Sequence, residues 1–401
     1  MRKSLLPPGP PNLFQGIKSK IAEAEKAGIK VTSFAIGQPA GPAYVEARIG
    51  AAQAVLSDQE TMHEYQDNGS PGVPGFAERF VKCHVRTQLT IPENMAVCPI
   101  PGIKPILDYV VKSLGSWTAH GRSSVVGTMT APGYPTPADA CAMIRGVEHF
   151  DIKVDPENGF LFDPQDIGFE DNLGEGDMLM LNFPHNPTGI IATRNFLRKV
   201  CSYCQQRGVR LFNDGAYLRL SHTPESTALA DVAIEFPELN WMEAYSASKA
   251  GNNTGSRIGA VVGSPEFVSD FKQVKGKMDS GFVASMAAGV IELFERYPHR
   301  IDEVQQVYQR RLEALINILE AQGMRLAVQP EAGFFALFKL PQEAFGTTLS
   351  DAAEFNDLMI QRTGFVGVPF GQYIRYSVAA RDVEALAENI TSAFRQAQVR
   401  Y

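Results

Sequence analysis

The sequence predicts an α/β protein with a large domain built on a mostly parallel sheet and a smaller α+β domain. Short apolar runs with little alternation, such as residues 178–182, are typical of strands buried on both faces. Helical patterns separate these runs, and strands that alternate with helices form a parallel sheet covered on both sides. After about residue 285 this alternation stops. We therefore expect the large domain over 45–285 and the small domain over 1–44 together with 286–401.

The N-terminal part of the chain predicts an amphipathic helix over 15–28, a short strand over 30–36 and a helix over 44–57. From about residue 75, helical patterns alternate with short apolar runs. The strands with the clearest boundaries are 178–182, 209–213, 241–245 and 258–262, and a helix over 195–207 follows the first of them.

The C-terminal part predicts a different mixture of elements. A long helix with a charged face is expected over 298–322, and Gly323 is well placed to end it. Strands are expected over 334–339 and 373–378, and a final helix over 382–397. This mixture predicts a second α+β unit, which the N-terminal segment would complete.

The composition is that of a soluble globular protein with a sizeable core, since 44% of the 401 residues are hydrophobic and 20% are charged. The net charge of -7 lacks the basic footprint that nucleic-acid binding requires. The first residues carry two basic side chains but no apolar run of the kind found in secretory signals. No apolar stretch approaches the ~18 residues that cross a bilayer. We expect a cytoplasmic protein that binds neither membranes nor nucleic acid.

The five cysteines are scattered and odd in number, which fits a reducing compartment better than a disulfide framework. Cys201 and Cys204 form a lone C-x-x-C pair inside a helical pattern. A metal would need a second pair at ligand spacing, and the sequence has none. We interpret both as thiols packed on a helix, with a redox or metal role as the open alternative.

Four segments put distinctive residues next to predicted strands. In an open α/β sheet, ligands bind at the carboxyl ends of the strands, so these segments are candidates for one site. The segments are LNFPHNPTG (181–189), FNDGAYL (212–218), SASK (246–249) and GSRIG (255–259).

Each of these residues has a plain structural interpretation when it is taken alone. Asp214 would cap a helix or turn, and Tyr217 would belong to the core. Lys249 would be a surface residue, and Arg257 would form a structural ion pair. Asn186 begins a turn sequence, Asn-Pro-Thr-Gly. Their order along the chain points to a different interpretation.

Taken in order, the motifs NPTG, Asp-x-x-Tyr, Ser-x-Ser-Lys and Asn-x-Thr-Gly-x-Arg-Ile-Gly resemble those of the class I/II aminotransferases. These are the fold-type-I enzymes that use pyridoxal 5′-phosphate. The resemblance covers nearly the whole chain and implies a mostly parallel seven-stranded sheet in an α/β/α sandwich. The weaker matches are IGQP (36–39), Tyr65, PGIK (101–104), PGYP (132–135) and Arg375 in YIRYSV.

The resemblance implies a role for each residue around the cofactor ring. Lys249 would hold the cofactor's aldehyde covalently and later move the substrate's α-proton. Asp214 would keep the ring nitrogen protonated, which deepens the cofactor's electron sink. Tyr217 and Asn186 would donate hydrogen bonds to the phenolic oxygen, and Tyr134 would stack on the ring.

The resemblance also implies residues for the cofactor's phosphate. A helix start offers main-chain amides, a hydroxyl can donate, and a guanidinium can bind in a forked geometry. The residues in these roles would be Gly102, Ile103, Lys104, Ser246 and Arg257. Tyr65 would reach the phosphate of the neighbouring subunit, which implies a homodimer with shared active sites.

The substrate's α-carboxylate needs a planar, bidentate cation, and the resemblance gives this role to Arg375. Gly37 would approach the same carboxylate through its main chain, with Asn186 beside the substrate. From its pattern alone, an arginine in a C-terminal strand would be a surface or edge residue. No metal is implied.

The sequence departs from the family's pattern at three places. Gly215 stands where a glutamate is usual, and Ala250 with Gly251 follows the lysine in place of the usual pattern. Ile103 replaces a small polar residue in the phosphate turn, so a hydroxyl is lost. Arg257 and the main-chain amides would have to compensate for that loss.

The implied activity is transfer of an amino group from an amino acid to a 2-oxo acid, 2-oxoglutarate or pyruvate, in ping-pong half-reactions. The N-terminal segment resembles the LL-diaminopimelate and alanine/aspartate branches. A pyridoxal-phosphate lyase that eliminates at the β-carbon is an alternative on the same fold. A non-catalytic binding module is a third alternative. The sequence speaks against this one because Lys249 and its partners are retained and no helix-turn-helix precedes the fold.

Overall fold

The computed structural model describes residues 13–86, 94–115, 121–166 and 173–401. The chain forms two compact units. The large unit comprises residues 38–310 and 328–335, and the small unit comprises 1–37, 311–327 and 336–401. The two units are compact parts of the chain, whereas the predicted boundary near residue 285 separates domains that fold or move independently. That boundary stays a prediction.

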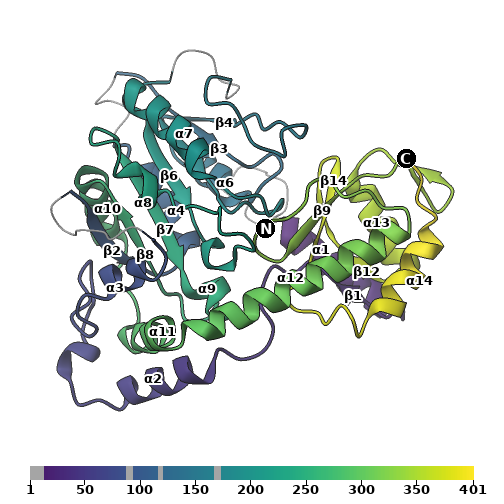
Figure 1. Cartoon of the computed structure of the whole chain (residues 1–401), viewed down its shortest axis with the longest axis horizontal. Helices are drawn as coiled ribbons and strands as arrows, with labels where there is room; N and C mark the ends of the chain where they lie inside the picture. The colour runs from purple at the N-terminus through teal and green to yellow at the C-terminus, as the bar shows by residue number, and fades with distance from the viewer. Residues whose placement is uncertain (1–12, 87–93, 116–120, 167–172) are drawn as a thin grey trace, which may run out of the picture. The chain divides into compact units, whose positions relative to one another are not determined.

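The large unit is built on a seven-stranded sheet with the order β2-β8-β7-β6-β5-β3-β4 (Figure 1). Every neighbouring pair is parallel except those of β8, which runs antiparallel to β7 and β2. This confirms the mostly parallel sheet. The strands are β2 (Ala96–Ile100), β3 (Ser124–Thr128), β4 (Val147–Asp151), β5 (Met178–Leu181), β6 (Arg210–Asp214), β7 (Trp241–Ser246) and β8 (Gly259–Gly263).

Helices pack on both faces of this sheet, as in an α/β/α sandwich. Phe212 and Met242 pack into the core with α4 (Ile103–Lys112), α6 (Thr136–Ala142) and α10 (Pro265–Met278). On the other face lie α3 (Phe76–Lys82), α7 (Arg194–Arg207) and α8 (Ala230–Ala233). Because neighbouring residues of a strand point to opposite faces, Asn213 and Glu243 face this second set of helices.

Two further helices of the large unit cross closely. A Cβ at Gly289 of α11 (Ala284–Arg296) would lie 2.1 Å from the carbonyl oxygen of Ala47 in α2 (Val45–Val55). Only glycine allows this approach. The remaining elements of the large unit are η1 (Glu60–Met62), η2 (Leu218–Leu220), α9 (Ala247–Ala250) and the first part of α12 (Pro298–Ala321).

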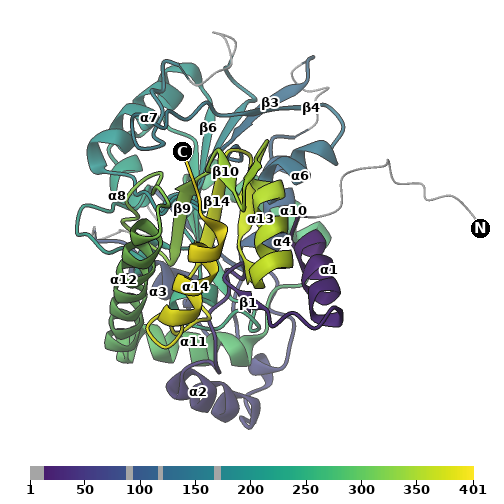
Figure 2. The same ribbon diagram turned by 90° about the vertical axis from the view of Figure 1, so that its right-hand side faces the viewer.

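The small unit contains a three-stranded sheet of β9 (Phe335–Lys339), β14 (Tyr373–Ser377) and β13 (Val368–Phe370), with β14 in the centre (Figure 2). Its other strands are the parallel pair β1 (Thr32–Ser33) and β12 (Phe365–Val366), and the hairpin β10 (Glu343–Ala344) and β11 (Thr347–Thr348). Its helices, besides the end of α12, are α1 (Leu13–Lys26), α13 (Ala352–Thr363) and α14 (Ala387–Ala397).

A core joins the helices of the small unit to its strands. Ile17 of α1 packs with Ile360 of α13 and Val366 of β12. Phe394 of α14 contacts the ring of Tyr376 in β14 at 6.0 Å between centroids. These contacts bury the centre of β14, the strand that carries Arg375.

Two predicted elements are shorter than expected. The strand predicted over 30–36 pairs with β12 only at Thr32 and Ser33. The helix predicted over 382–397 begins at Ala387. A turn in which Asp382 accepts a hydrogen bond from the amide of Ala385 precedes it.

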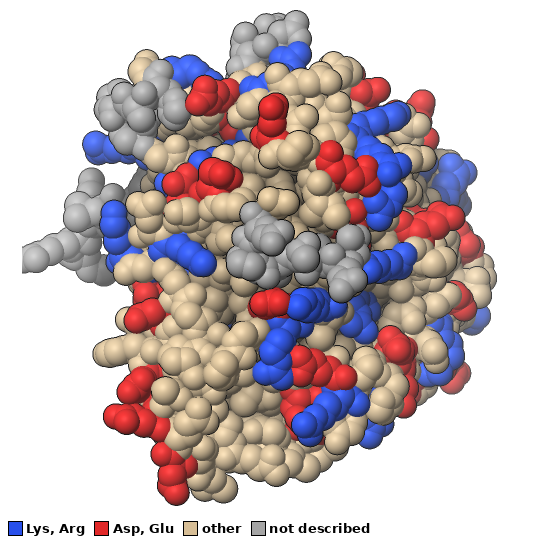
Figure 3. Space-filling view, turned by 60° about the vertical axis from the view of Figure 1, so that its left-hand side comes forward, with Lys and Arg blue, Asp and Glu red and all other residues tan. Residues whose placement is uncertain are grey.

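The expectation that Cys201 and Cys204 pack on a helix is confirmed, because both lie buried on α7. In the described ranges, no helix combines the length and apolarity that a membrane span requires. The same residues contain no group of three or more potential metal ligands among His, Cys, Asp and Glu. On the face shown in Figure 3, acidic and basic side chains are interspersed.

Candidate active site

The strand register brings three of the predicted segments to one edge of the large sheet. Ser246 at the end of β7 pairs with Gly259 at the start of β8, and Gly259 also pairs with Ile100 at the end of β2. Gly102 and Arg257 therefore lie just beyond the same edge. This is the edge at which α/β sheets bind ligands.

Arg257 lies directly against Gly102. A Cβ at Gly102 would lie 2.5 Å from a terminal guanidinium nitrogen of Arg257, and the φ of Gly102 is +80°. Arg257 itself has a φ of +57°, an uncommon conformation for a side chain of this size. Its Nη1 donates to the carbonyl oxygen of Thr254 at 2.9 Å and lies 3.5 Å from the hydroxyl of Ser248. The guanidinium is thus held at the start of α4.

The same place collects donors that suit an anion. The hydroxyl of Ser246 accepts from the amide of Ser248 and donates to its hydroxyl at 2.9 Å. Within the described chain, no side chain caps α4 at Gly102, so the first amides of this helix are available to a ligand. Ile103 is buried and Lys104 is exposed. A phosphate fits this combination of hydroxyl, guanidinium and helix start.

Asp214 is the last residue of β6, and its carboxylate is buried. One oxygen accepts a hydrogen bond from the amide of Ala216 at 3.1 Å. Burial raises the pKa of Asp214 to about 6, although that amide and the charge of Lys249 act in the opposite direction. A cation placed against this carboxylate would lower its pKa again. Asp214 therefore fits a protonated ring nitrogen.

Lys249 lies in α9, directly after β7, among the small buried side chains of Ala247, Ser248 and Ala250. Its ammonium group is 6.0 Å from the centre of the Tyr217 ring. The Tyr217 ring is buried and packs edge-on against Phe334 at 5.6 Å. The structure thus brings the amine of Lys249 close to both Tyr217 and Asp214.

Tyr134 and Asn186 complete this group. Tyr134 lines a small cavity together with Asn182 and Asp214. Burial raises the pKa of the Tyr134 hydroxyl, and the charges of Asp214 and Arg257 both act on it. Asn186 is buried, and its amide donates to the side-chain oxygen of Asn182 at 3.0 Å.

Three predicted residues do not join this group within the large unit. Tyr65 follows η1 on the surface and is 79% exposed. Arg375 and Gly37 belong to the small unit. Arg375 is fully buried there, so the plain expectation of a surface arginine is wrong. Its Nη2 donates to the carbonyl oxygen of Ala35 at 3.0 Å, and its guanidinium carbon lies 5.5 Å from the centre of the Phe370 ring.

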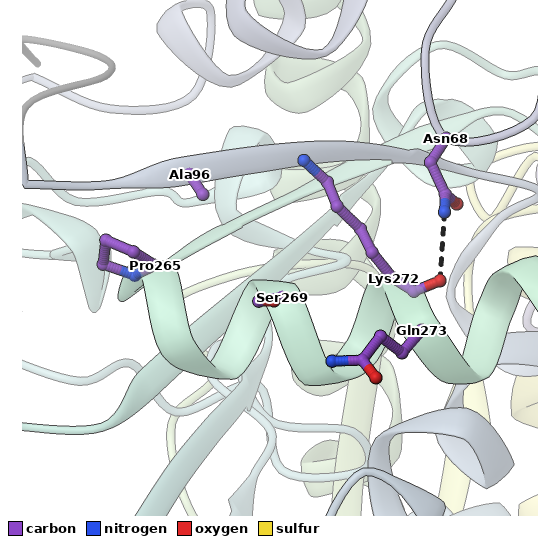
Figure 4. A pocket seen from close by; sticks show the side chains of 6 residues that line it. All are labelled: Asn68, Ala96, Pro265, Ser269, Lys272 and Gln273. Atoms are coloured by element: carbon purple, nitrogen blue, oxygen red, sulfur yellow. Dashed lines mark hydrogen bonds between the residues drawn. The ribbon is translucent and has the colours of Figure 1, made fainter.

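A shallow groove elsewhere on the large unit contains none of the predicted residues. It lies along α10 and is lined by Asn68, Ala96, Pro265, Ser269, Lys272 and Gln273 (Figure 4). The side chain of Asn68 donates to the carbonyl oxygen of Lys272 at 3.0 Å. This bond fastens the loop that carries Tyr65 to α10.

Sequence reasoning missed a set of buried polar residues in the same strands. Asn182 donates to the carbonyl oxygen of Asp214 at 2.9 Å, and Asn213 hydrogen-bonds Glu243 at 2.7 Å. Tyr245 donates to the other oxygen of Glu243 at 2.6 Å. The signal was a polar residue inside an otherwise apolar strand, as in LFND and WMEAY.

Comparisons with known proteins agree with this geometry. The family model for aminotransferase class I and II matches residues 29–392. An LL-diaminopimelate aminotransferase of Dehalococcoides mccartyi is 29% identical over 391 residues, which cover 93% of each chain. The enzyme of the same name from Methanocaldococcus jannaschii is 30% identical over 315 residues, 78% of this chain and 72% of that one.

Solved structures share the fold. Substrate-bound BacF from Bacillus subtilis has a TM-score of 0.83 at 20% identity, and the match covers 99% of each chain. Aspartate aminotransferase from Thermus thermophilus with maleate has a TM-score of 0.77 at 19% identity, and the match covers 96% of each chain. With the family match across most of its length, this chain belongs to the class I and II aminotransferases, which are pyridoxal 5′-phosphate-dependent enzymes of fold type I.

Proposed function

We propose that this aminotransferase moves an amino group from an amino acid to 2-oxoglutarate or pyruvate, with Lys249 as the residue that binds the cofactor covalently and moves the α-proton. The single observation that carries the assignment is the position of the Lys249 amine, 6.0 Å from the Tyr217 ring and within the electrostatic reach of the buried Asp214. Bound pyridoxal phosphate supplies an electron sink that makes the substrate's α-proton acidic.

The other residues of the large unit would bind and orient the cofactor. Asp214 would hold the ring nitrogen protonated, and Tyr217 and Asn186 would donate to the phenolic oxygen. Tyr134, half-buried beside Asp214, would stack on the ring. The phosphate would lie among Gly102, Ile103, Lys104, Ser246 and Arg257. The contact between Arg257 and Gly102 supports this last assignment, since a side chain at position 102 would fill the cradle.

Arg375 would bind the substrate's α-carboxylate. Its guanidinium lies near the rings of Phe14 and Phe370, at 5.8 and 5.5 Å, and one nitrogen is fixed to the carbonyl of Ala35. Such contacts restrict a planar cation to one orientation, which suits bidentate binding. Gly37, two residues after Ala35, would approach the same carboxylate through its main chain.

LL-diaminopimelate is the first amino donor to test, because two relatives named LL-diaminopimelate aminotransferase align with most of the chain. A half-reaction screen of the twenty common amino acids plus LL-diaminopimelate, followed through the cofactor's visible absorbance, identifies the donor. The lyase alternative predicts a 2-oxo product without any added acceptor. Transfer predicts that product formation beyond one turnover depends on 2-oxoglutarate or pyruvate.

We also propose a cytoplasmic homodimer in which Tyr65 contacts the cofactor phosphate of the neighbouring subunit. The exposure of Tyr65 and of several apolar side chains of the same unit, including Leu56 at 82%, supports an interface there. Hybrid dimers test it. Mixing Tyr65→Phe with Lys249→Ala subunits should restore one wild-type site per hybrid dimer. Activity no greater than the sum of the two parents would contradict shared sites.

A further inference from the structure

Glu243 is a fully buried carboxylate with no proposed role in binding the cofactor or the substrate. It lies on β7, on the face of the sheet opposite the carboxylate of Asp214. Its oxygens accept from the side chains of Asn213 and Tyr245, at 2.7 and 2.6 Å, and from the amide of Ala230 at 2.8 Å. These partners are all neutral donors. A buried carboxylate with such a set of donors is held in one orientation.

We propose that Glu243 is a positioning residue for the aminotransferase reaction: by fixing the side-chain amide of Asn213, it holds the loop that carries Asn186 against the strand that carries Asp214. This inference rests on the proposed roles of Asn186 and Asp214.

The side chain of Asn213, in β6, makes two hydrogen bonds to the main chain of Phe183. Its side-chain oxygen accepts from the amide of Phe183 at 2.9 Å, and its nitrogen donates to the carbonyl of Phe183 at 3.1 Å. The same nitrogen donates to Glu243. If the amide were flipped, its oxygen would face both the carboxylate and a carbonyl oxygen, so Glu243 selects the orientation that binds Phe183.

The hydrogen bonds between Asn213 and Phe183 lie close in the chain to the proposed site residue Asn186. Phe183 is three residues before Asn186, in the segment that leaves β5. On the other face of the sheet, Asn182 donates to the carbonyl of Asp214 and accepts from the amide of Asn186. The end of β5 is therefore tied to β6 from both faces. A loosened Asn213 weakens the tie on one face, while the Asn182 bonds remain on the other face.

Glu243 is itself fixed from the side of β7. The Tyr245 ring stacks on His84, with centroids 4.7 Å apart and planes 16° apart. Burial raises the pKa of Glu243 to about 7, and its hydrogen bonds oppose that rise. Tyr245 lies four residues before Lys249. One carboxylate thus joins the ends of the three strands that lead to Asn186, Asp214 and Lys249.

The test compares Glu243→Gln with Asp177→Asn in the holoenzyme. A glutamine must turn its NH₂ group either toward Asn213 or toward Ala230, and both of these are donors. Asp177 is the control, because it is equally buried, accepts from the amides of Val125 and Gly174, and lies before β5, at the opposite end of the strands from the site. Unlike Glu243, it also pairs with Arg122 at 2.8 Å. Both changes replace one oxygen by nitrogen in a buried carboxylate.

The readouts are the pH midpoint of the cofactor's visible absorbance and the separate values of kcat and KM. A hydrogen-bond donor to the cofactor's phenolic oxygen stabilises the deprotonated form of the bound cofactor. If Asn186 is displaced, this stabilisation weakens and the pH midpoint of the absorbance rises. We expect Glu243→Gln to raise it by about 0.5 unit, as expected for one weakened hydrogen bond. We expect kcat to fall about tenfold, the effect of a small misplacement, with KM little changed. Asp177→Asn should change neither value, whatever its loss of thermal stability.

Equal effects of the two variants would overturn the proposal, because a loss of general stability would then explain both. If Glu243→Gln does not fold, Tyr245→Phe removes one donor from Glu243 and should raise the midpoint in the same direction; an unchanged midpoint would also overturn it. Asn186→Ala separates the proposal from the function on which it rests. If that variant leaves the midpoint unchanged, the role of Asn186 fails; if it raises the midpoint while Glu243→Gln does not, only the role of Glu243 fails.

Discussion

Replacing Asp214 by asparagine is expected to have opposite effects on stability and on activity. Burial raises the pKa of this carboxyl from 3.8 to about 6. Between these two pH values the folded, cofactor-free protein holds the proton and the unfolded chain does not, so stability falls as the pH rises through this window. At neutral pH the buried charge therefore destabilises the cofactor-free protein by about 3 kcal/mol, since one pKa unit corresponds to about 1.4 kcal/mol.

Asparagine removes this charge and can still accept the hydrogen bond from the amide of Ala216. Its NH₂ group is buried in exchange, and an unmet donor costs about 1–3 kcal/mol. The net expectation is that the cofactor-free Asp214→Asn protein is more stable than wild type by about 1 kcal/mol at pH 7.5. Urea unfolding of both proteins measures the difference.

The same change should reduce turnover by about 10²–10³-fold, the range observed when one preorganised electrostatic partner of a reacting group is removed. Single-turnover decay of the cofactor's absorbance after mixing with the amino acid measures this step. Asp139→Asn is the control, because Asp139 is exposed and its charge also acts on Tyr134. Full activity of Asp214→Asn, or a loss of more than 1 kcal/mol in the cofactor-free form, would refute the reasoning.

Three further predictions follow from other contacts. Arg375→Ala should raise KM for amino and 2-oxo acids alike, and an unchanged KM in steady-state kinetics would assign the residue elsewhere. Gly102→Ala should weaken cofactor binding by at least about tenfold in equilibrium titrations, because its Cβ would lie 2.5 Å from a guanidinium nitrogen and its φ is +80°. Lys275→Met should lower the free energy of unfolding by about 3–5 kcal/mol, because it leaves the Asp279 carboxylate, 2.7 Å from the buried ammonium, without its cation. Lys277→Met, on the exposed side of the same helix, should change the urea midpoint little.

The strands around the site could be predicted from the sequence because each is a short, largely apolar run. The predicted ranges 178–182, 209–213, 241–245 and 258–262 differ from β5, β6, β7 and β8 by at most one residue at each end. A strand that is buried on both faces needs apolar side chains along most of its length, and this pattern can be read from a short stretch of sequence. The length of β1 was not predictable in this way, because it depends on a partner strand more than 300 residues later.

The candidate site was predictable to a different degree for each residue. The order of Asn186, Asp214, Lys249 and Arg257 follows from motifs, and the register brings the segments that carry them to one sheet edge. The buried contacts of Glu243 depend on how side chains of neighbouring strands pack together. No sequence motif predicts this packing. The proposed contact of Tyr65 does not lie within one chain, since its partner belongs to a second subunit.

The most direct test of the central claim is to locate the covalent bond between cofactor and protein. Reduction of the holoenzyme with borohydride, followed by proteolysis and mass spectrometry, fixes the cofactor to the lysine that holds it. We expect the pyridoxyl phosphate adduct on the peptide that contains Lys249, with no adduct in Lys249→Ala. An adduct on another lysine, or no bound cofactor at all, would contradict the account.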